Sequence, residues 1–153
     1  MPPIAIDNLH ALKSFVGREV GVSDWHAITQ DHVQQFADAT GDHQWIHLDR
    51  ERARRESPFG TTIAHGFLTL SLISSLMKEA VQIRGARLVV NYGVNRVRFP
   101  APVRVDSKVR ARFSVLAVKE LDDSLEVTFS VAVECDSAKK PCCVAEWVLR
   151  YYV

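Results

Sequence analysis

The most restrictive feature of this sequence is the alternation of apolar and polar residues through its last third. From residue 103 to 115 an apolar residue recurs at nearly every second position, and residues 125–133 and 143–153 repeat the pattern. A period of two is that of a β-strand with one apolar face. Residues 122–123 and 137–141 interrupt the pattern as hairpin loops. We therefore expect three long antiparallel strands that turn their apolar faces to a common core.

The first half of the chain carries helix signals instead. A first strand is expected within residues 16–28, after which Thr29 is a good N-cap for a helix over residues 30–40 that ends at Gly41. Ile28 and Val33 are placed to form a hydrophobic staple across that cap. Asp49 is expected to cap a second, short helix that runs through Arg55.

A longer helix is expected from Gly66 to about Arg84, ending before Gly85. Its first half is apolar on nearly every side, and a helix of that kind must be surrounded by protein. The apolar residues are Phe67, Leu68, Leu70, Leu72, Ile73, Leu76 and Met77. We therefore expect an α+β fold in which an antiparallel sheet wraps around one long central helix, within a single domain over residues 1–153.

Composition excludes several classes of function. The net charge of +1 and the absence of a dominant basic block argue against nucleic acid as a partner. The uncharged run over residues 66–77 is too short to span a bilayer, so no membrane partner is expected. The arginines and glutamates of residues 50–56 indicate a solvated helix face rather than a phosphate site. Three cysteines without CxxC spacing, and no apolar leader, favour a cytoplasmic protein with thiols that pack as small apolar residues.

The segment ATGDHQWIHLD, residues 39–49, holds the residues best suited to chemistry. Asp42 and His47 are five positions apart across a loop that follows a helix end, so both side chains can reach one substrate atom. An ionised carboxylate can hold and deprotonate a water molecule, and a histidine can deliver or accept a proton near neutral pH. Such a pair suits the addition of water to a double bond, or its removal.

A second element is expected where the apolar helix begins, at AHGF, residues 64–67. The first N–H groups of a helix lack partners within the helix, and the helix dipole favours negative charge there. Because Gly66 has no Cβ, a substrate carbonyl can approach its amide closely. An oxyanion stabilised by such a donor gains roughly 3 kcal/mol.

Structural explanations of the same residues stay open. Gly-Asp after a helix is often only a C-cap and a turn, a histidine beside apolar residues is often structural, and Gly66 can simply permit tight packing. His43 and His65 can be imagined with Asp42 and His47 around a metal, but no HxH or HExxH spacing supports this, and no metal is expected. Ser74 is a better hydrogen-bonding partner than nucleophile, because no base neighbours it in the sequence.

Two motifs taken together resemble a known family. FADATGDHQWIH (residues 36–47) and HGFLTLSLIS (residues 65–74) are similar to segments of the (R)-specific enoyl-CoA hydratases and MaoC-like dehydratases. NYGVNRVRFPAPV (residues 91–103) is typical of their nodulation-protein-N-like branch, and the resemblance covers roughly residues 15–150. It implies the hot-dog fold and a homodimer whose sheets join edge to edge, with a thioester tunnel near the interface.

The resemblance also implies roles for individual residues. Asp42 and His47 take the places of the family's catalytic aspartate and histidine, Gly66 that of its oxyanion-hole glycine, and Ser74 that of a serine that orients the aspartate. In the family scheme the aspartate and histidine hold a water for attack at the β-carbon, while a proton is delivered to the α-carbon.

The sequence departs from the family where hydratases carry Asn-Pro between the aspartate and histidine. This chain has His43, Gln44 and Trp45 there. Gln44 offers the same amide one methylene further out, and Trp45 puts a large ring in place of a rigid turn-former. We assign Gln44, Trp45, His65 and Ser74 to the substrate-binding surroundings of the catalytic pair.

The function expected from these residues is reversible hydration of trans-2-enoyl thioesters to (R)-3-hydroxyacyl thioesters, with CoA favoured over acyl carrier protein as the carrier. No cofactor is expected beyond the CoA carried by the substrate. Two alternatives stay open: an acyl-CoA thioesterase of the same fold, and a non-catalytic subunit that binds acyl thioesters.

Overall fold

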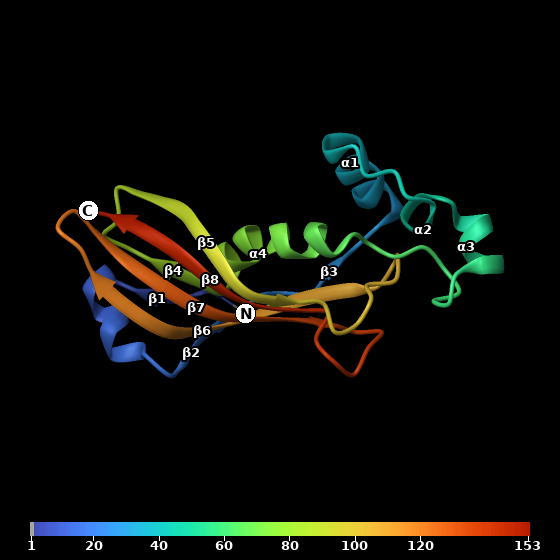
Figure 1. The fold of residues 1–153 in the computed structure, drawn as a ribbon. Coiled ribbons are helices and arrows are strands. Elements are labelled where there is room, and N and C mark those ends of the chain that lie inside the picture. The colour runs from blue at the N-terminus through green and yellow to red at the C-terminus, as the bar shows by residue number, and fades with distance from the viewer. Residues whose placement is uncertain (1) are drawn as a thin grey trace.

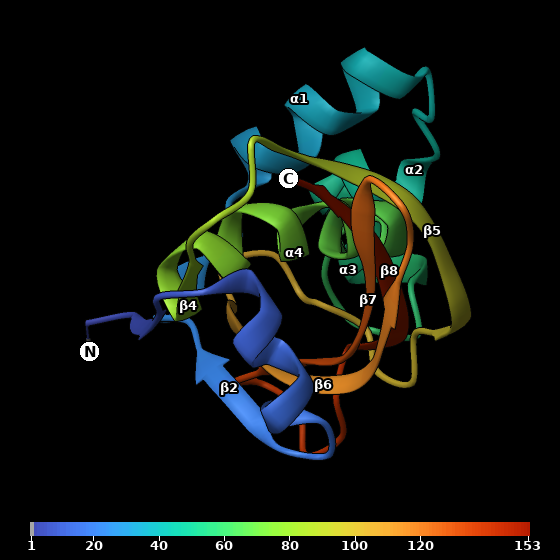
Figure 2. The same cartoon turned by 90° about the vertical axis from the view of Figure 1, so that its left-hand side faces the viewer.

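The computed structural model describes residues 2–153 and contains one main antiparallel sheet. Its strands lie in the order β2, β6, β7, β8, β5, and β3 pairs with β6 beyond β2. Figures 1 and 2 show these strands curling around the helix α4, so the expected sheet wrapped around one long helix is confirmed. The bounds of the strands are Glu19–Val22 (β2), His26–Ala27 (β3), Leu88–Arg98 (β5), Lys108–Glu120 (β6), Ser124–Cys135 (β7) and Cys143–Tyr152 (β8).

The period-two pattern is confirmed by the register of the three long strands. Phe113 pairs with Val131, and Phe129 pairs with Trp147, so large apolar side chains stand side by side on the concave face. The first of the three predicted long strands, expected from residue 103, begins later than predicted, because β6 starts only at Lys108. Val103 and Val105 are buried, but a turn with Asp106 at a φ of 72° separates them from the strand.

The central helix α4, Gly66–Ala80, lies on the concave face of the sheet (Figure 2). Leu68, Ile73 and Leu76 are among its buried residues. At its C-terminal end β2 passes so close that a Cβ on Gly21 would lie 2.3 Å from the carbonyl oxygen of Ala80. Only glycine permits this approach of a strand to a helix backbone.

Two expectations for α4 are wrong. The helix ends at Ala80 and not near Arg84, because Val81–Ile83 (β4) leaves it to pair in parallel with Ile4–Ile6 (β1). The β-branched side chains of Val81 and Ile83 suit this extended conformation. The helix is also not surrounded on every side within one chain, since Phe67 is 69% exposed.

Three helices project beyond the end of the sheet as an overhang above the start of α4 (Figure 1). They are α1 (Gln30–Thr40), α2 (Trp45–Leu48) and α3 (Arg50–Glu56), preceded in the chain by a 3₁₀ helix over Leu9–Phe15. The predicted caps are confirmed: Thr29 accepts from the N–H of His32, Gly41 adopts a φ of 81°, and Asp49 accepts from the N–H of Arg52. The single turn of α2 was not predicted.

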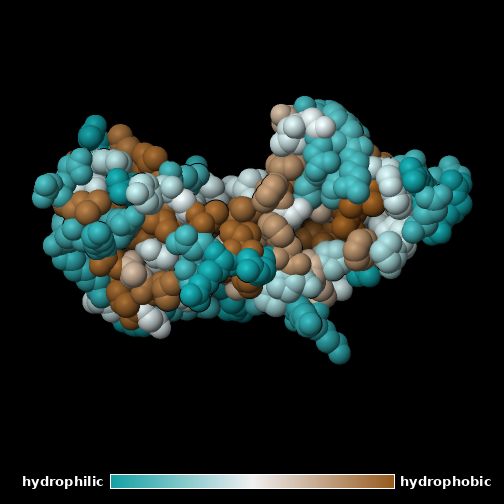
Figure 3. Space-filling view, viewed as in Figure 1, coloured by the Kyte–Doolittle hydropathy of each residue, from teal (hydrophilic) through white to brown (hydrophobic). Residues whose placement is uncertain are grey.

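Strand β5 forms one edge of the sheet and leaves a row of large apolar side chains exposed. They are Leu88, Val89, Val90, Tyr92 and Val94. Figure 3 shows further apolar surface in the hollow over α4, between the overhang and the opposite end of the sheet. Unpaired apolar edges are unusual on isolated proteins and mark interaction surfaces.

Two expectations from composition can be compared with the structure. All three cysteines are free and buried, as expected of thiols that pack like small apolar residues. None of the helices in residues 2–153 is long and apolar enough to cross a membrane.

Candidate active site

Asp42 and His47 lie where α1 gives way to α2. Gly41 ends α1 in a left-handed conformation, which turns the chain and places Asp42 in the following loop. The single turn of α2 then carries His47 inward, so that its ring is only 7% exposed while the Asp42 side chain remains 55% exposed. The local structure therefore combines a carboxylate that is open to solvent with an imidazole that is partly dry.

The carboxylate and the imidazole meet in space. One oxygen of Asp42 and one ring nitrogen each of His47 and His65 lie within 4.8 Å of one another. The rings of His47 and His65 are stacked, with centroids 3.8 Å apart and planes inclined by 23°. The predicted pair thus converges, and His65 joins it.

A backbone carbonyl determines which nitrogen of His47 can act as a base. Nδ1 of His47 lies 2.7 Å from the carbonyl oxygen of Ile63, which can only accept, so Nδ1 carries the hydrogen. In the neutral ring Nε2 is then the basic atom. No described residue forms a hydrogen bond with this nitrogen, so it is free to bind a water or a substrate hydroxyl.

The surroundings lower the pKa of His47. Burial of the ring, which disfavours its charged form, is the largest cause, and the neighbouring His65 acts in the same direction. The hydrogen bond to Ile63 and the charge of Asp42 oppose this shift without cancelling it. His47 is therefore an uncharged base at neutral pH.

The start of α4 presents unpaired amides, as predicted. The carbonyl of His65 accepts from Leu68 and Thr69, but within residues 2–153 the N–H groups of Gly66 and Phe67 have no hydrogen-bond acceptor. The amide of Gly66 is not engaged in sheet pairing, so it can donate to a ligand oxygen.

Packing also explains why residue 66 is glycine. A Cβ at this position would lie 3.0–3.1 Å from three carbons of the Phe99 ring. Phe99 in turn makes an edge-on contact with Phe67 at a centroid distance of 6.1 Å. The structural and the catalytic explanations of Gly66 are therefore compatible, and an experiment has to separate them.

His65 lies directly beside the predicted pair but is deeply buried. Its side chain is 3% exposed and lies against His47, and its Nε2 is 2.9 Å from the backbone carbonyl oxygen of Asp42. Buried in this way, it suits support of the catalytic pair better than the predicted contact with substrate. The AHGF motif marked the residue, but nothing local in the sequence indicates which group it contacts.

The remaining predicted residues lie around the pair at different distances. The backbone N–H of Gln44 donates to Oδ1 of Asp42, at 3.3 Å, while the guanidinium of Arg52 lies 4.2 Å above the ring of Trp45. Trp45 therefore braces α3. His43 turns away and pairs with Asp38 at 3.0 Å.

Ser74 is far from Asp42 within one chain. It stands eight residues beyond Gly66 on α4, which is about 12 Å along the helix axis at about 1.5 Å per residue. Its neighbours in the hollow beside α4 include Asn91 and Trp147, whose Nε1 donates to Oδ1 of Asn91 at 3.0 Å. The predicted contact with Asp42 is therefore not formed inside a single chain.

Asp42, His47 and His65 are residue types that bind metals, but their arrangement does not suit one. The lone pairs of an imidazole lie in the ring plane, so the stacked rings of His47 and His65 hold them in nearly parallel planes that do not meet at one point between the rings. One nitrogen of each ring is also bonded to a backbone carbonyl. The three residues fit proton transfer without rearrangement, whereas a metal would require the rings to turn.

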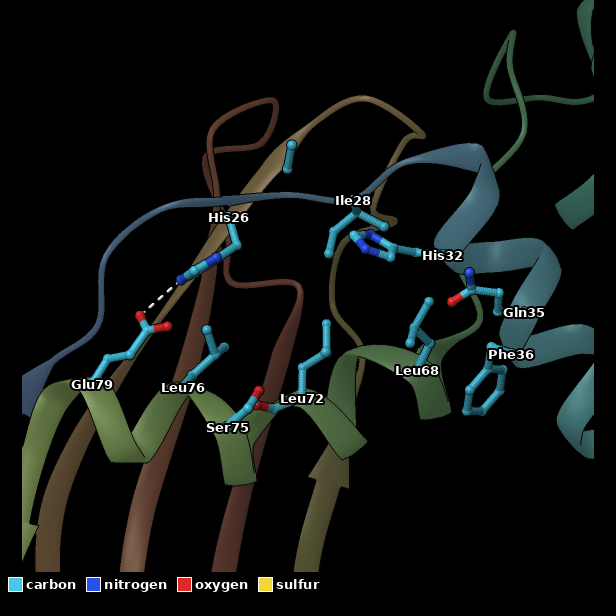
Figure 4. Close-up of a pocket in the computed structure, with 11 residues that line it drawn as sticks. His26, Ile28, His32, Gln35, Phe36, Leu68, Leu72, Ser75, Leu76 and Glu79 are labelled. Carbon is cyan, nitrogen blue, oxygen red and sulfur yellow. Dashed lines mark hydrogen bonds and ion pairs between the residues drawn. The ribbon is translucent and has the colours of Figure 1, made fainter.

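An open groove of about 460 Å³ lies beside this cluster, between α1, β3 and α4 (Figure 4). Leu68, Leu72 and Leu76 line it from α4, and a hydrogen bond between His26 and Glu79, 2.7 Å long, spans one end. At the other end Phe36 contacts the ring of His65 at a centroid distance of 4.9 Å. Phe36 thus connects the groove to the catalytic cluster.

Known proteins share this sequence and fold. Residues 12–135 match the family described as "MaoC like domain". The 3-hydroxyacyl-thioester dehydratase Z of Mycobacterium tuberculosis is 52% identical over 141 residues, which are 92% of this chain and 93% of that protein. Nodulation protein N of Rhizobium leguminosarum bv. viciae is 44% identical, over 92% of this chain and 89% of that protein.

A solved structure supports the same relationship. The (R)-hydratase from A. caviae involved in PHA biosynthesis superposes with a TM-score of 0.71 at 25% identity, covering 88% of this chain and 94% of that one. The resemblance inferred from the two motifs is therefore confirmed.

The opposite environments of two nearby histidines lead to a titration experiment. We expect NMR titration to place His47 below the usual histidine pKa of 6.5, because of its burial, and His43 above it, because of its hydrogen bond to Asp38. An unfolded chain protonates His47 more readily, so the stability that this residue contributes is present above pH 6.5 and is lost as the pH falls below that value. A midpoint for His47 at or above that of His43 would contradict the arrangement described.

Proposed function

Because the chain belongs to the MaoC-like domain family, we propose that it is a hydro-lyase that interconverts trans-2-enoyl and (R)-3-hydroxyacyl thioesters. The observation that supports this most strongly is the convergence of Asp42 and His47 beside His65, whose chain neighbour Gly66 has an unpaired amide. A base, a second water-binding group and an oxyanion donor are the three components that this reaction needs.

In the hydration direction, the Asp42 carboxylate and Nε2 of His47 hold one water molecule. The water oxygen bonds to the β-carbon of the enoyl group, and the pair takes up the proton that it loses. Electron density moves to the thioester oxygen, which the Gly66 amide stabilises, and one proton is then delivered to the α-carbon. Dehydration runs through the same steps in reverse.

The substrate is an acyl thioester with CoA as its carrier, and the reaction uses no further cofactor. Addition of water across a double bond transfers protons and a hydroxyl group without net oxidation or reduction, so no redox cofactor is needed. The residues present can perform those transfers, since the pKa of His47 is held below its usual value and the carboxylate is exposed.

The working unit is a homodimer in which β5 of one chain meets β5 of a second copy. The row of exposed apolar residues on β5 supports this, because pairing two such edges would bury them and satisfy their free backbone groups. The dimer would also supply Ser74: a serine too distant from Asp42 in its own chain can reach it only from the second copy.

The function is tested by the reaction of purified protein with crotonyl-CoA and longer enoyl-CoAs, followed by loss of the conjugated-thioester absorbance. Asp42→Asn should lower kcat by at least about 10²-fold, because it removes one of the two proton-transfer groups. Asp38→Asn is the matched control, since that carboxylate pairs with His43 outside the site. Release of free thiol from acyl-CoA would identify a thioesterase, and thioester binding without any turnover would identify a binding subunit.

The two explanations of Gly66 are separated by a pair of variants. Gly66→Ala should lower both stability and activity, since its Cβ meets the Phe99 ring. Adding Phe99→Ala removes that contact, so the double variant should unfold at the same temperature as Phe99→Ala alone. Its activity should nevertheless stay at least about tenfold below that of Phe99→Ala alone. Full recovery of activity in the double variant would show that Gly66 serves packing only.

The dimer is tested by charge on the exposed edge. Val90→Lys combined with Val94→Lys should convert the protein to a monomer and reduce turnover sharply, because like charges would meet across the interface and Ser74 would be lost from each site. Leu116→Lys, at a comparably exposed apolar position on β6, is the control. Light scattering gives the mass, and a fully active monomer would overturn the arrangement.

A further inference from the structure

The loop that carries Asp42 is held to the rest of the protein by few contacts. Within residues 2–153, nearly all hydrogen bonds of residues 41–44 stay inside the overhang: Gly41 bonds Ala37, His43 bonds Asp38, and Gln44 bonds Asp42 and His47. The exception is the bond from Nε2 of His65 to the carbonyl oxygen of Asp42, across 23 residues of sequence. The side chain of His65 therefore anchors the loop that carries the Asp42 carboxylate.

The same side chain restrains the catalytic imidazole. Its ring stacks on His47 at 3.8 Å, while the Ile63 carbonyl holds Nδ1 of His47 at 2.7 Å. Together these contacts oppose rotation of the His47 ring, one nitrogen of which lies within 4.8 Å of a carboxylate oxygen of Asp42. Phe36 packs on the ring of His65 in turn, at 4.9 Å.

His65 occupies this position at an energetic disadvantage. Because Nε2 donates to a carbonyl, Nδ1 of the neutral ring is an acceptor, and this buried atom has no hydrogen-bond partner in the described part of the chain. An unpaired buried polar atom destabilises the fold, because it has given up its hydrogen bonds to water without gaining a partner. A phenylalanine would fill the space without that disadvantage, but it has no N–H for the Asp42 loop.

We propose that His65 is a positioning residue, which sets the geometry of Asp42 and His47 through its hydrogen bond and its ring stack without touching the substrate. This inference rests on the proposed hydratase function. His65 also directly precedes Gly66, so one residue connects the carboxylate, the imidazole and the oxyanion amide.

Two substitutions separate the hydrogen bond from the ring. His65→Phe keeps an aromatic ring and loses the donor, whereas His65→Gln keeps an N–H donor of similar reach and loses the ring. We expect His65→Phe to match or exceed the wild-type unfolding temperature, because it removes the unpaired nitrogen. Its kcat should nevertheless fall by about 10- to 100-fold, with KM within about threefold of wild type, since a displaced catalytic group slows the reaction steeply.

His65→Gln should show the opposite combination, with a lower unfolding temperature but a higher kcat than His65→Phe. The proposal would be overturned if the variant with the higher unfolding temperature also had the higher kcat. A kcat of His65→Phe within threefold of wild type would overturn it as well. Hydrogen exchange provides a test that does not depend on the reaction. The amides of residues 41–44 should exchange faster in His65→Phe than in His65→Gln, and equal exchange in both variants would overturn the positioning role even in a protein without hydratase activity.

Discussion

Burial of α4 against the concave face of the sheet is the constraint on which the rest of the structure depends. The helix makes close contacts at both ends: β2 approaches the carbonyl of Ala80 at Gly21, which requires glycine, and the Phe99 ring lies against Gly66. These two contacts restrict how far the helix can shift along the sheet. The free amides at its start consequently point to a defined place beneath the overhang, and a site can be assembled around them.

The site uses backbone carbonyls to organise its histidines. The backbone carbonyl of Ile63 receives the hydrogen on Nδ1 of His47, and that of Asp42 receives the one on Nε2 of His65, so backbone groups define the tautomer of both rings. Stacking keeps the rings together, and burial keeps His47 uncharged. The carboxylate can therefore stay in solvent while the base beside it remains neutral, which suits a reaction that moves protons in both directions.

A single chain leaves part of the apolar surface of the central helix uncovered, so burial within one chain does not fully explain the all-apolar pattern of that helix. Phe67 remains exposed although the sequence pattern indicated burial, and the apolar residues of β5 are exposed as well. In the proposed homodimer a second copy would cover these residues. The position of Ser74, far from Asp42 in its own chain, is consistent with the same explanation.

Much of the fold could be read from local signals. Thr29, Gly41 and Asp49 act on their own turns of backbone, and the alternation around Phe113 and Phe129 assigns each side chain to a face of the sheet without knowledge of the partner strand. Asp42, His47 and Gly66 were identified for the same reason, since short spacing and residue chemistry express what they can do.

Tertiary structure decided whatever depends on residues distant in the chain. The end of α4 at Ala80 follows from the pairing of Val81–Ile83 with β1, which no helix signal records. The place of His65 follows from its stack on His47 and its bond to Asp42. The sequence by itself determined which groups are available for chemistry, and the folded chain determined their distances and tautomers, because such contacts act through space and leave no periodic trace in the sequence.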